Sequence, residues 1–161
     1  MLNEQKLFDL LNEIPDPEVP AISIVELGVV RRIAIDHSNE SVVVTMTPTY
    51  SGCPALEVMQ EEIVKKLSSA GVRTVRIALE YAPAWTTDWL TEDTKEKLRL
   101  YGIAPPPLTD DLVSIGSIRH PACPYCGSKN TILKSAFGST ACKALHFCSD
   151  CTQPFEEFKA C

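Results

Sequence analysis

Residues 4–14 have the spacing of apolar residues that is typical of one buried helix face. Apolar side chains recur there at i, i+3, i+4 and i+7. The stripe consists of Leu7, Leu10, Leu11 and Ile14. Pro15 should end this helix, because the residue before a proline avoids helical geometry. The Asp16-Pro17-Glu18-Val19-Pro20 segment that follows is too rich in proline to be a regular helix or a central strand.

Two β-branched runs come next, at residues 29–35 and 41–47. Branched side chains favour a pleated, half-buried surface, so both runs are predicted strands. The polar residues 36–40 join them and have the length of an ordinary hairpin loop. The sequence therefore predicts an antiparallel hairpin.

A second helix is predicted from Pro54 to about residue 70, followed by a strand over 72–80. Proline suits the first helical position and Gly71 suits the position after the last turn. A right-handed crossover through this helix makes the third strand parallel to the second. The predicted class is α/β (α+β): a small mixed sheet in α-β-β-α-β order covered by helices. A further helix is predicted over 88–100.

The proline run at residues 105–107 is a stiff extended spacer and marks the predicted main boundary. We expect an α/β domain over 1–104, a Pro-rich linker and connecting arm over 105–118, and a small module over 119–161.

Composition excludes several classes of protein. The 161 residues are 45% hydrophobic, which is enough for a packed core. No apolar run approaches the ~20 residues that span a bilayer, and the first ten residues lack a secretory pattern. We therefore expect a cytoplasmic protein. Residues 1–118 carry 10 Lys and Arg against 18 Asp and Glu, a net charge of −8. Residues 119–161 carry 5 against 3, a net charge of +2, so nucleic acid is not an expected partner.

Four of the seven cysteines form two C-x2-C pairs, separated by 21 residues. They are Cys123, Cys126, Cys148 and Cys151. Two such turns supply four tetrahedral thiolate ligands, the pattern of a zinc ribbon. The module has few large apolar residues, so a bound metal should carry much of its stability. Structural zinc is favoured. Iron is the alternative, because the Cys123–Gly127 turn resembles a rubredoxin knuckle and would make the tail an electron carrier.

Three further residues lie close enough in sequence to compete as ligands: Cys142, His146 and Cys161. Alternatively, Cys142 is a small buried hydrophobic residue and Cys161 is a free thiol.

Cys53 stands apart, directly before Pro54 at the start of the second helix. Unpaired amides and the helix dipole there stabilise a thiolate, and the alternative is a buried structural cysteine. Asp16 and Glu18 are either oxygen ligands beside that thiolate or a solvated turn. A catalytic Cys53 acting on a thioester would need a base. The three histidines, His37, His120 and His146, offer no convincing one.

Three motifs resemble the SufT-like family of iron–sulfur assembly factors. They are the Asp16–Pro20 turn, the Leu-Gly-x-Val strand entry at 27–30 and the Gly-Cys-Pro helix start at 52–54. The resemblance covers residues 1 to about 90 and implies a small α/β domain. By the same resemblance Cys53 would be a transient ligand for iron or an iron–sulfur cluster, with Asp16 and Glu18 beside it. The chain departs from the family at 81–85, where an acidic residue of the turn is missing.

With its four-cysteine tail, the whole chain is similar to the PaaD family, which belongs to the phenylacetyl-CoA epoxidase systems of bacterial phenylacetate degradation. The tail segments that carry this similarity are 137–145 and 154–159. The resemblance implies an accessory or maturation factor rather than an enzyme in its own right. Its partners would be the oxygenase or reductase subunits, with the iron–sulfur reductase favoured, and self-association stays open. A purely structural component of the epoxidase is the alternative.

Overall fold

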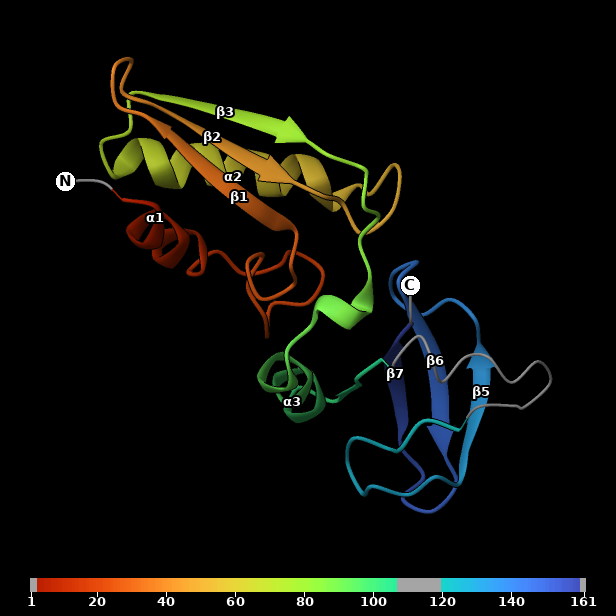
Figure 1. Ribbon diagram of the computed structural model, residues 1–161. Coiled ribbons are helices and arrows are strands. Elements are labelled where there is room, and N and C mark those ends of the chain that lie inside the picture. The colour runs from red at the N-terminus through yellow and green to blue at the C-terminus, as the bar shows by residue number, and fades with distance from the viewer. Residues whose placement is uncertain (1–2, 107–119, 160–161) are drawn as a thin grey trace. The chain divides into compact units, whose positions relative to one another are not determined.

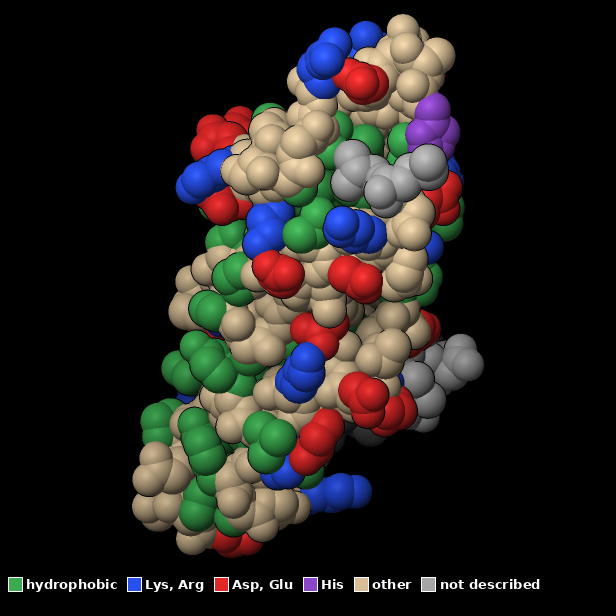
Figure 2. All heavy atoms as spheres, turned by 90° about the vertical axis from the view of Figure 1, so that its left-hand side faces the viewer, with side chains coloured by type: hydrophobic (Ala, Val, Ile, Leu, Met, Phe, Trp, Pro, Cys, Tyr) green, Lys and Arg blue, Asp and Glu red, His purple; other side chains and the backbone are tan. Residues whose placement is uncertain are grey.

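The computed structural model describes residues 3–106 and 120–159, and the chain divides into two compact units, residues 1–85 and 86–161. Within the described residues, none of the helices is long and apolar enough to cross a membrane. Acidic and basic side chains are interspersed over the face shown in Figure 2.

The first unit is a three-stranded sheet with two helices (Figure 1). Its elements are α1 (Glu4–Leu11), β1 (Val30–Asp36), β2 (Ser41–Met46), α2 (Ala55–Ser69) and β3 (Thr74–Leu79). The strand order is β1-β2-β3, with β1 antiparallel and β3 parallel to β2. The mixed sheet expected from the crossover argument is confirmed. Helix α2 runs along the sheet, and α1 packs beside α2 and β1.

The core of this unit follows the two periodicities of the sequence. Val42, Val44 and Met46 alternate along β2 and are at most 1% exposed, so one face of the strand is fully buried. Every fourth residue of α2 from Ala55 to Leu67 is buried as well.

Helix α1 is shorter than expected. It ends at Leu11, and the amide of the C-cap residue Asn12 donates to the carbonyls of Phe8 and Leu10. Ile14 is still buried, but from a turn after the helix, where its amide donates to the Leu11 carbonyl and its carbonyl accepts the amide of Ile24. The apolar spacing correctly predicts a buried face, although its last member is not helical.

Among its described residues, the second unit contains a four-stranded sheet. Its elements are a 3₁₀ turn η1 (Thr87–Trp89), α3 (Glu92–Leu100), β4 (Ile103–Ala104), β5 (Thr131–Ser135), β6 (Lys143–Cys148) and β7 (Pro154–Phe158). The strand order is β4-β7-β6-β5. The helix expected over 88–100 is divided, because Thr86 and Thr91 each accept an amide hydrogen bond at the start of their own helical segment.

Along the chain, the division between the two compact units falls between Trp85 and Thr86, whereas the boundary expected from the sequence is near residue 104. The reason is a pairing across a long stretch of sequence. Ile103 and Ala104 pair in parallel with Glu156 and Glu157 of β7, and α3 packs on β4. From residue 107 onward, the expected connecting arm lies outside the described residues.

Candidate metal centre and the Cys53 region

The four tail cysteines converge on one point. The Cys123 and Cys151 sulfurs are 3.6 Å apart, as are those of Cys126 and Cys148, and all four lie within 4.8 Å of one another. Four thiolates bound at about 2.3 Å to a single tetrahedral ion would be about 3.8 Å apart. The donor set and its spacing therefore fit a tetrahedral thiophilic metal ion.

The backbone forms both cysteine turns in the same way. After the second cysteine of each pair the chain takes a left-handed conformation, at Gly127 (φ 76°) and at Thr152 (φ 58°). A left-handed threonine is sterically costly, so the second turn keeps this geometry against a local preference. Convergence of the four sulfurs is thus built into the fold of both turns.

Backbone amides point at the sulfur atoms. The amides of Cys151 and Asp150 donate to Cys148 Sγ and lower the pKa of that thiol to about 7. The amide of Gln153 donates to Cys151 Sγ, yet burial dominates there and raises the pKa of Cys151 to about 12. The amide of Ser128 donates to Cys126 Sγ. Donors of this kind favour thiolates, the form that binds metal.

Metal uptake should release protons in a pH-dependent number. The Cys151 thiol (pKa about 12) is protonated at neutral pH and must lose its proton to become a ligand, whereas Cys148 (pKa about 7) is protonated only below about pH 7. We expect metal affinity to rise with pH. About one more proton should be released per metal at about pH 6 than at about pH 8. Proton release on zinc addition, measured in weakly buffered solution with an indicator dye, tests this. An equal count at both pH values would contradict it.

The two turns are also joined by side chains. Asp150 Oδ2 accepts a hydrogen bond from Ser128 Oγ, and Asp150 Oδ1 accepts one from Asn130 Nδ2 at 2.8 Å. These donors hold the pKa of Asp150 below its usual range. The amide of Ser149 donates to the Asn130 carbonyl at 2.9 Å.

The competing ligands are not part of this cluster. Cys142 precedes β6 and Cys148 ends it, a separation of about 20 Å along an extended strand. The Cys142 sulfur instead lies 3.0 Å from Thr140 Oγ1. His146 is buried, stacks on Phe155 and places Nε2 2.9 Å from Glu157 Oε2. Cys161 lies outside the described residues.

The tail motif around residue 140 has a structural explanation. Glu156 Oε2 accepts hydrogen bonds from the Ser139 amide and hydroxyl, at 3.2 and 2.9 Å. A Cβ on Gly138 would lie 2.6 Å from the same oxygen. The loop between β5 and β6 is therefore held against Glu156, which accounts for the serine of this motif.

Cys53 lies where the sequence predicts it, immediately before α2. Pro54 is the N-cap residue and supplies no side-chain capping bond, while the Cys53 carbonyl accepts the Leu56 amide at 3.1 Å. The Cys53 side chain is 6% exposed. The thiol is thus nearly buried beside a helix start that has no side-chain cap.

Asp16 has a defined structural role. It is 4% exposed, and its Oδ1 accepts the amides of Glu18 and Val19 at 2.9 and 2.6 Å. Over residues 3–106 and 120–159, the tail cysteines are the only group of three or more potential ligands within 4.8 Å of one another. Cys53, Asp16 and Glu18 are not brought together as a preformed ligand set.

Replacing Asp16 with alanine should destabilise the first unit by about 2 kcal/mol, because two amides lose a charged acceptor in a buried turn. Chemical denaturation measures this loss. Asp16→Asn is the matched control, since an amide oxygen can still accept both bonds and should retain most of the stability. Equal stability of Asp16→Ala and the wild type would contradict this role.

Hydrogen bonds tie two motif segments of the first unit to nearby chain, and a third joins the strand entry to the turn at 81–85. The Asp16 amide donates to the Ile22 carbonyl, the Thr47 amide donates to the Val29 carbonyl, and Trp85 Nε1 donates to the Leu27 carbonyl at 2.9 Å. The loop that leads to Cys53 and the turn at 81–85 line one small pocket of about 120 Å³. Trp85 therefore contacts the strand entry and lines this pocket, although the turn lacks its acidic residue. The sequence did not predict this contact.

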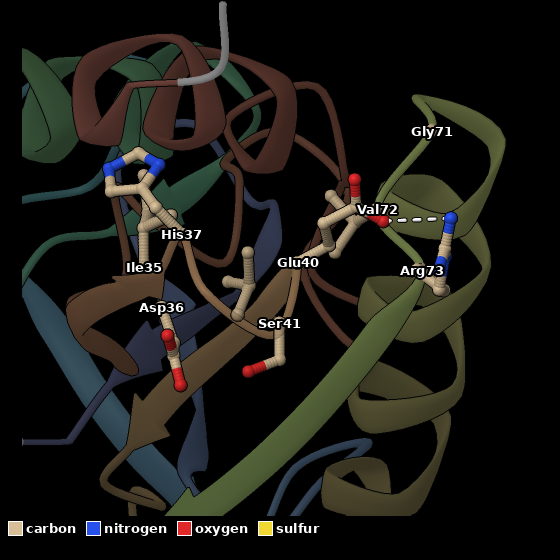
Figure 3. A pocket seen from close by; sticks show the side chains of 9 residues that line it. Ile35, Asp36, His37, Glu40, Ser41, Gly71, Val72 and Arg73 are labelled. Atoms are coloured by element: carbon tan, nitrogen blue, oxygen red, sulfur yellow. Dashed lines mark ion pairs between the residues drawn. The ribbon is translucent and has the colours of Figure 1, made fainter.

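A larger pocket, of about 420 Å³, lies at the hairpin end of the sheet (Figure 3). Its wall includes His37 and the exposed ion pair between Arg73 and Glu40. His37 therefore belongs to this pocket. His120 Nδ1 lies 2.7 Å from the Thr131 carbonyl oxygen in the second unit.

Comparison with known proteins assigns both parts of the chain. Residues 4–78 match the family described as iron-sulfur cluster assembly protein, and residues 110–159 match the PaaD zinc beta ribbon domain. An Escherichia coli (strain K12) protein, named as the D component of 1,2-phenylacetyl-CoA epoxidase, is 44% identical over 160 residues. The match covers 96% of this chain and 91% of that protein. The chain belongs to the PaaD family of phenylacetyl-CoA epoxidase components.

The first unit has relatives of its own beyond the PaaD family. An Fe-S protein maturation auxiliary factor of Porphyromonas gingivalis (strain ATCC BAA-308 / W83) is 31% identical over 59% of this chain and 90% of that protein. The crystal structure of a DUF59 domain from Bacillus anthracis matches with a TM-score of 0.55 and 31% identity, over 59% of this chain and 90% of that one. This PaaD-family chain thus joins an assembly-type domain to a metal ribbon. These relationships support an accessory role.

Proposed function

We propose that this protein is a maturation factor of the phenylacetyl-CoA epoxidase system of bacterial phenylacetate degradation. It assists assembly of an iron–sulfur or iron centre, and its client is the iron–sulfur reductase. The observation that carries the proposal is the similarity over 96% of the chain to a PaaD-type protein, combined with an assembly-type first unit in which Cys53 directly precedes the start of α2.

Cys53 is the proposed point of contact with the cargo. A thiolate at the amino end of a helix is stabilised by the unpaired amides and by the helix dipole. The low exposure of the side chain would protect a soft metal–sulfur bond from water. Asp16 fixes its own turn by accepting two backbone amides. Asp16 and Glu18 are the proposed oxygen ligands that would complete the site of the cargo.

The tail is proposed to hold one structural zinc ion through Cys123, Cys126, Cys148 and Cys151. Zinc suits a closed four-thiolate site and requires no redox change. Amide donors on the sulfur atoms would also suit iron, so a rubredoxin-like electron carrier is the second candidate. Metal analysis and visible absorption of anaerobically purified protein separate the two, because ferric thiolate is coloured and zinc thiolate is not.

Deletion of the gene that encodes this protein, in a host that grows on phenylacetate, tests the maturation role. The purified reductase should then contain less iron and acid-labile sulfide, and growth on phenylacetate should slow. The flavin content of the reductase serves as the control, since it should not change. A fully loaded reductase from the deletion strain would reject the maturation role and leave a structural or electron-carrying component.

A further inference from the structure

The two residues that donate amides to facing sulfur atoms are themselves tied together. Ser128 donates its amide to Cys126 Sγ, and Asp150 donates its amide to Cys148 Sγ. These two sulfur atoms are 3.6 Å apart, on opposite turns. The side chains of the same two residues are joined by the hydrogen bond from Ser128 Oγ to Asp150 Oδ2.

Asn130 extends this link into a closed network. Its side-chain amide donates to Asp150 Oδ1 at 2.8 Å, and its backbone amide donates to Ser128 Oγ at 3.0 Å. Its carbonyl accepts the amide of Ser149 at 2.9 Å. Each turn is therefore fixed to the other by one carboxylate, one hydroxyl and one carboxamide.

Electrostatic attraction to the metal does not explain a carboxylate here. Four thiolates and one divalent ion carry a net negative charge, so a further negative charge nearby is repelled. No oxygen of Asp150 belongs to the group of ligand atoms, which contains only the four sulfurs among the described residues. Hydrogen bonding explains the carboxylate at this position, because its two oxygens can accept hydrogen bonds from Ser128 and Asn130 at once.

We propose that Asp150 is a positioning residue that locks the two cysteine turns together and thereby slows metal release. This inference rests on the proposed metal site. In the locked form the amide donors of both turns stay aimed at their sulfurs, so a thiolate that leaves the ion is held close to it. Without the link, one turn can separate from the other and the ion is lost.

The metal-loaded full-length protein provides the test. Transfer of zinc to an excess of a chromophoric chelator measures the release rate. Partners that hold metal ligands in place typically contribute about 10- to 100-fold in affinity, so we expect Asp150→Asn to release zinc about tenfold faster. The introduced amide cannot accept both hydrogen bonds. Ser128→Ala should accelerate release similarly, and the double variant no more than the faster single one, because all three lose the same link.

Asp36 provides a matched control. Its carboxylate accepts hydrogen bonds from a serine and an asparagine in the same way, from Ser38 Oγ at 2.5 Å and Asn39 Nδ2 at 2.6 Å, but at the end of β1 in the first unit. Asp36→Asn should release zinc at the wild-type rate. Substitution of cobalt for zinc adds a spectroscopic measurement, in which the thiolate-to-cobalt absorption of Asp150→Asn should shift while that of Asp36→Asn does not.

The outcomes separate this inference from the metal site itself. Wild-type protein that binds no metal would reject both. Wild-type release rates and spectra in Asp150→Asn and Ser128→Ala would reject the positioning role alone. If Asp150→Asn cannot be loaded, Ser128→Ala decides by its rate. Accelerations that multiply in the double variant would show two independent effects and would also reject the link.

Discussion

Replacing Cys148 with serine is expected to abolish metal binding and to unfold the ribbon. Cys148 is fully buried and forms a small buried cluster with Cys123, Ala104 and Phe155, so two ligands are half of that cluster. For small zinc modules the binding free energy, about 10–16 kcal/mol, is also folding free energy. Metal content and limited proteolysis of the tail measure the two losses.

Cys142→Ser is the control for this experiment, because Cys142 precedes β6 at the end of the sheet away from the four sulfurs. It should keep one metal ion per chain and the protease resistance of the wild type. Cys126→Ser should lose the metal as Cys148→Ser does, although Cys126 is exposed. A Cys148→Ser protein with full metal content and an intact tail would refute the four-thiolate assignment.

Replacing Cys53 with alanine is expected to leave the fold nearly intact and to abolish the accessory function. The side chain is small and lies at an element boundary, so its removal should cost about 1 kcal/mol. The helix start, in contrast, loses the sulfur ligand that would hold iron or a cluster. Growth on phenylacetate and the cluster content of the reductase measure the function, and denaturation measures the fold.

Cys142→Ala serves here as the comparison, since it also removes a thiol outside the metal cluster. It should support normal growth. Asp16→Ala should show a milder functional loss if it shares the site, accompanied by the loss of stability expected from its two amide bonds. Normal growth and full cluster occupancy with folded Cys53→Ala protein would mean that Cys53 is structural, and the function would then have to lie in the tail or in an architectural contact.

Several elements could be predicted from local patterns. The β-branched runs, the stripe of α2 and the proline at its start each act over a few residues, and the structure places β1, β2, α2 and β3 within two residues of the expected bounds. The parallel pairing of β2 and β3 followed from the handedness of the crossover. The cysteine spacing likewise identified the four residues that converge.

The structure adds to these patterns, or departs from them, where distant segments make contact. Spacing alone could not show that Ile14 is buried from a turn outside the helix, because its carbonyl is bonded to the amide of Ile24. The place of Ile103 and Ala104 in the second sheet depends on β7, about fifty residues further along the chain. Cys142 and His146 could be excluded from the metal cluster only once the course of β6 was known. The spacing of the cysteines in the sequence does not contain that information.

The sequence by itself determined the main helices and strands of the first unit, its mixed sheet and the identity of the four converging cysteines, because periodicity and turn chemistry are local properties. The tertiary structure alone decided that Asp16 is a buried acceptor for two amides, and that Ser128 and Asp150 tie the two cysteine turns together. Those roles depend on which donors lie within hydrogen-bonding distance. That distance is set only when the segments that carry donor and acceptor pack against each other.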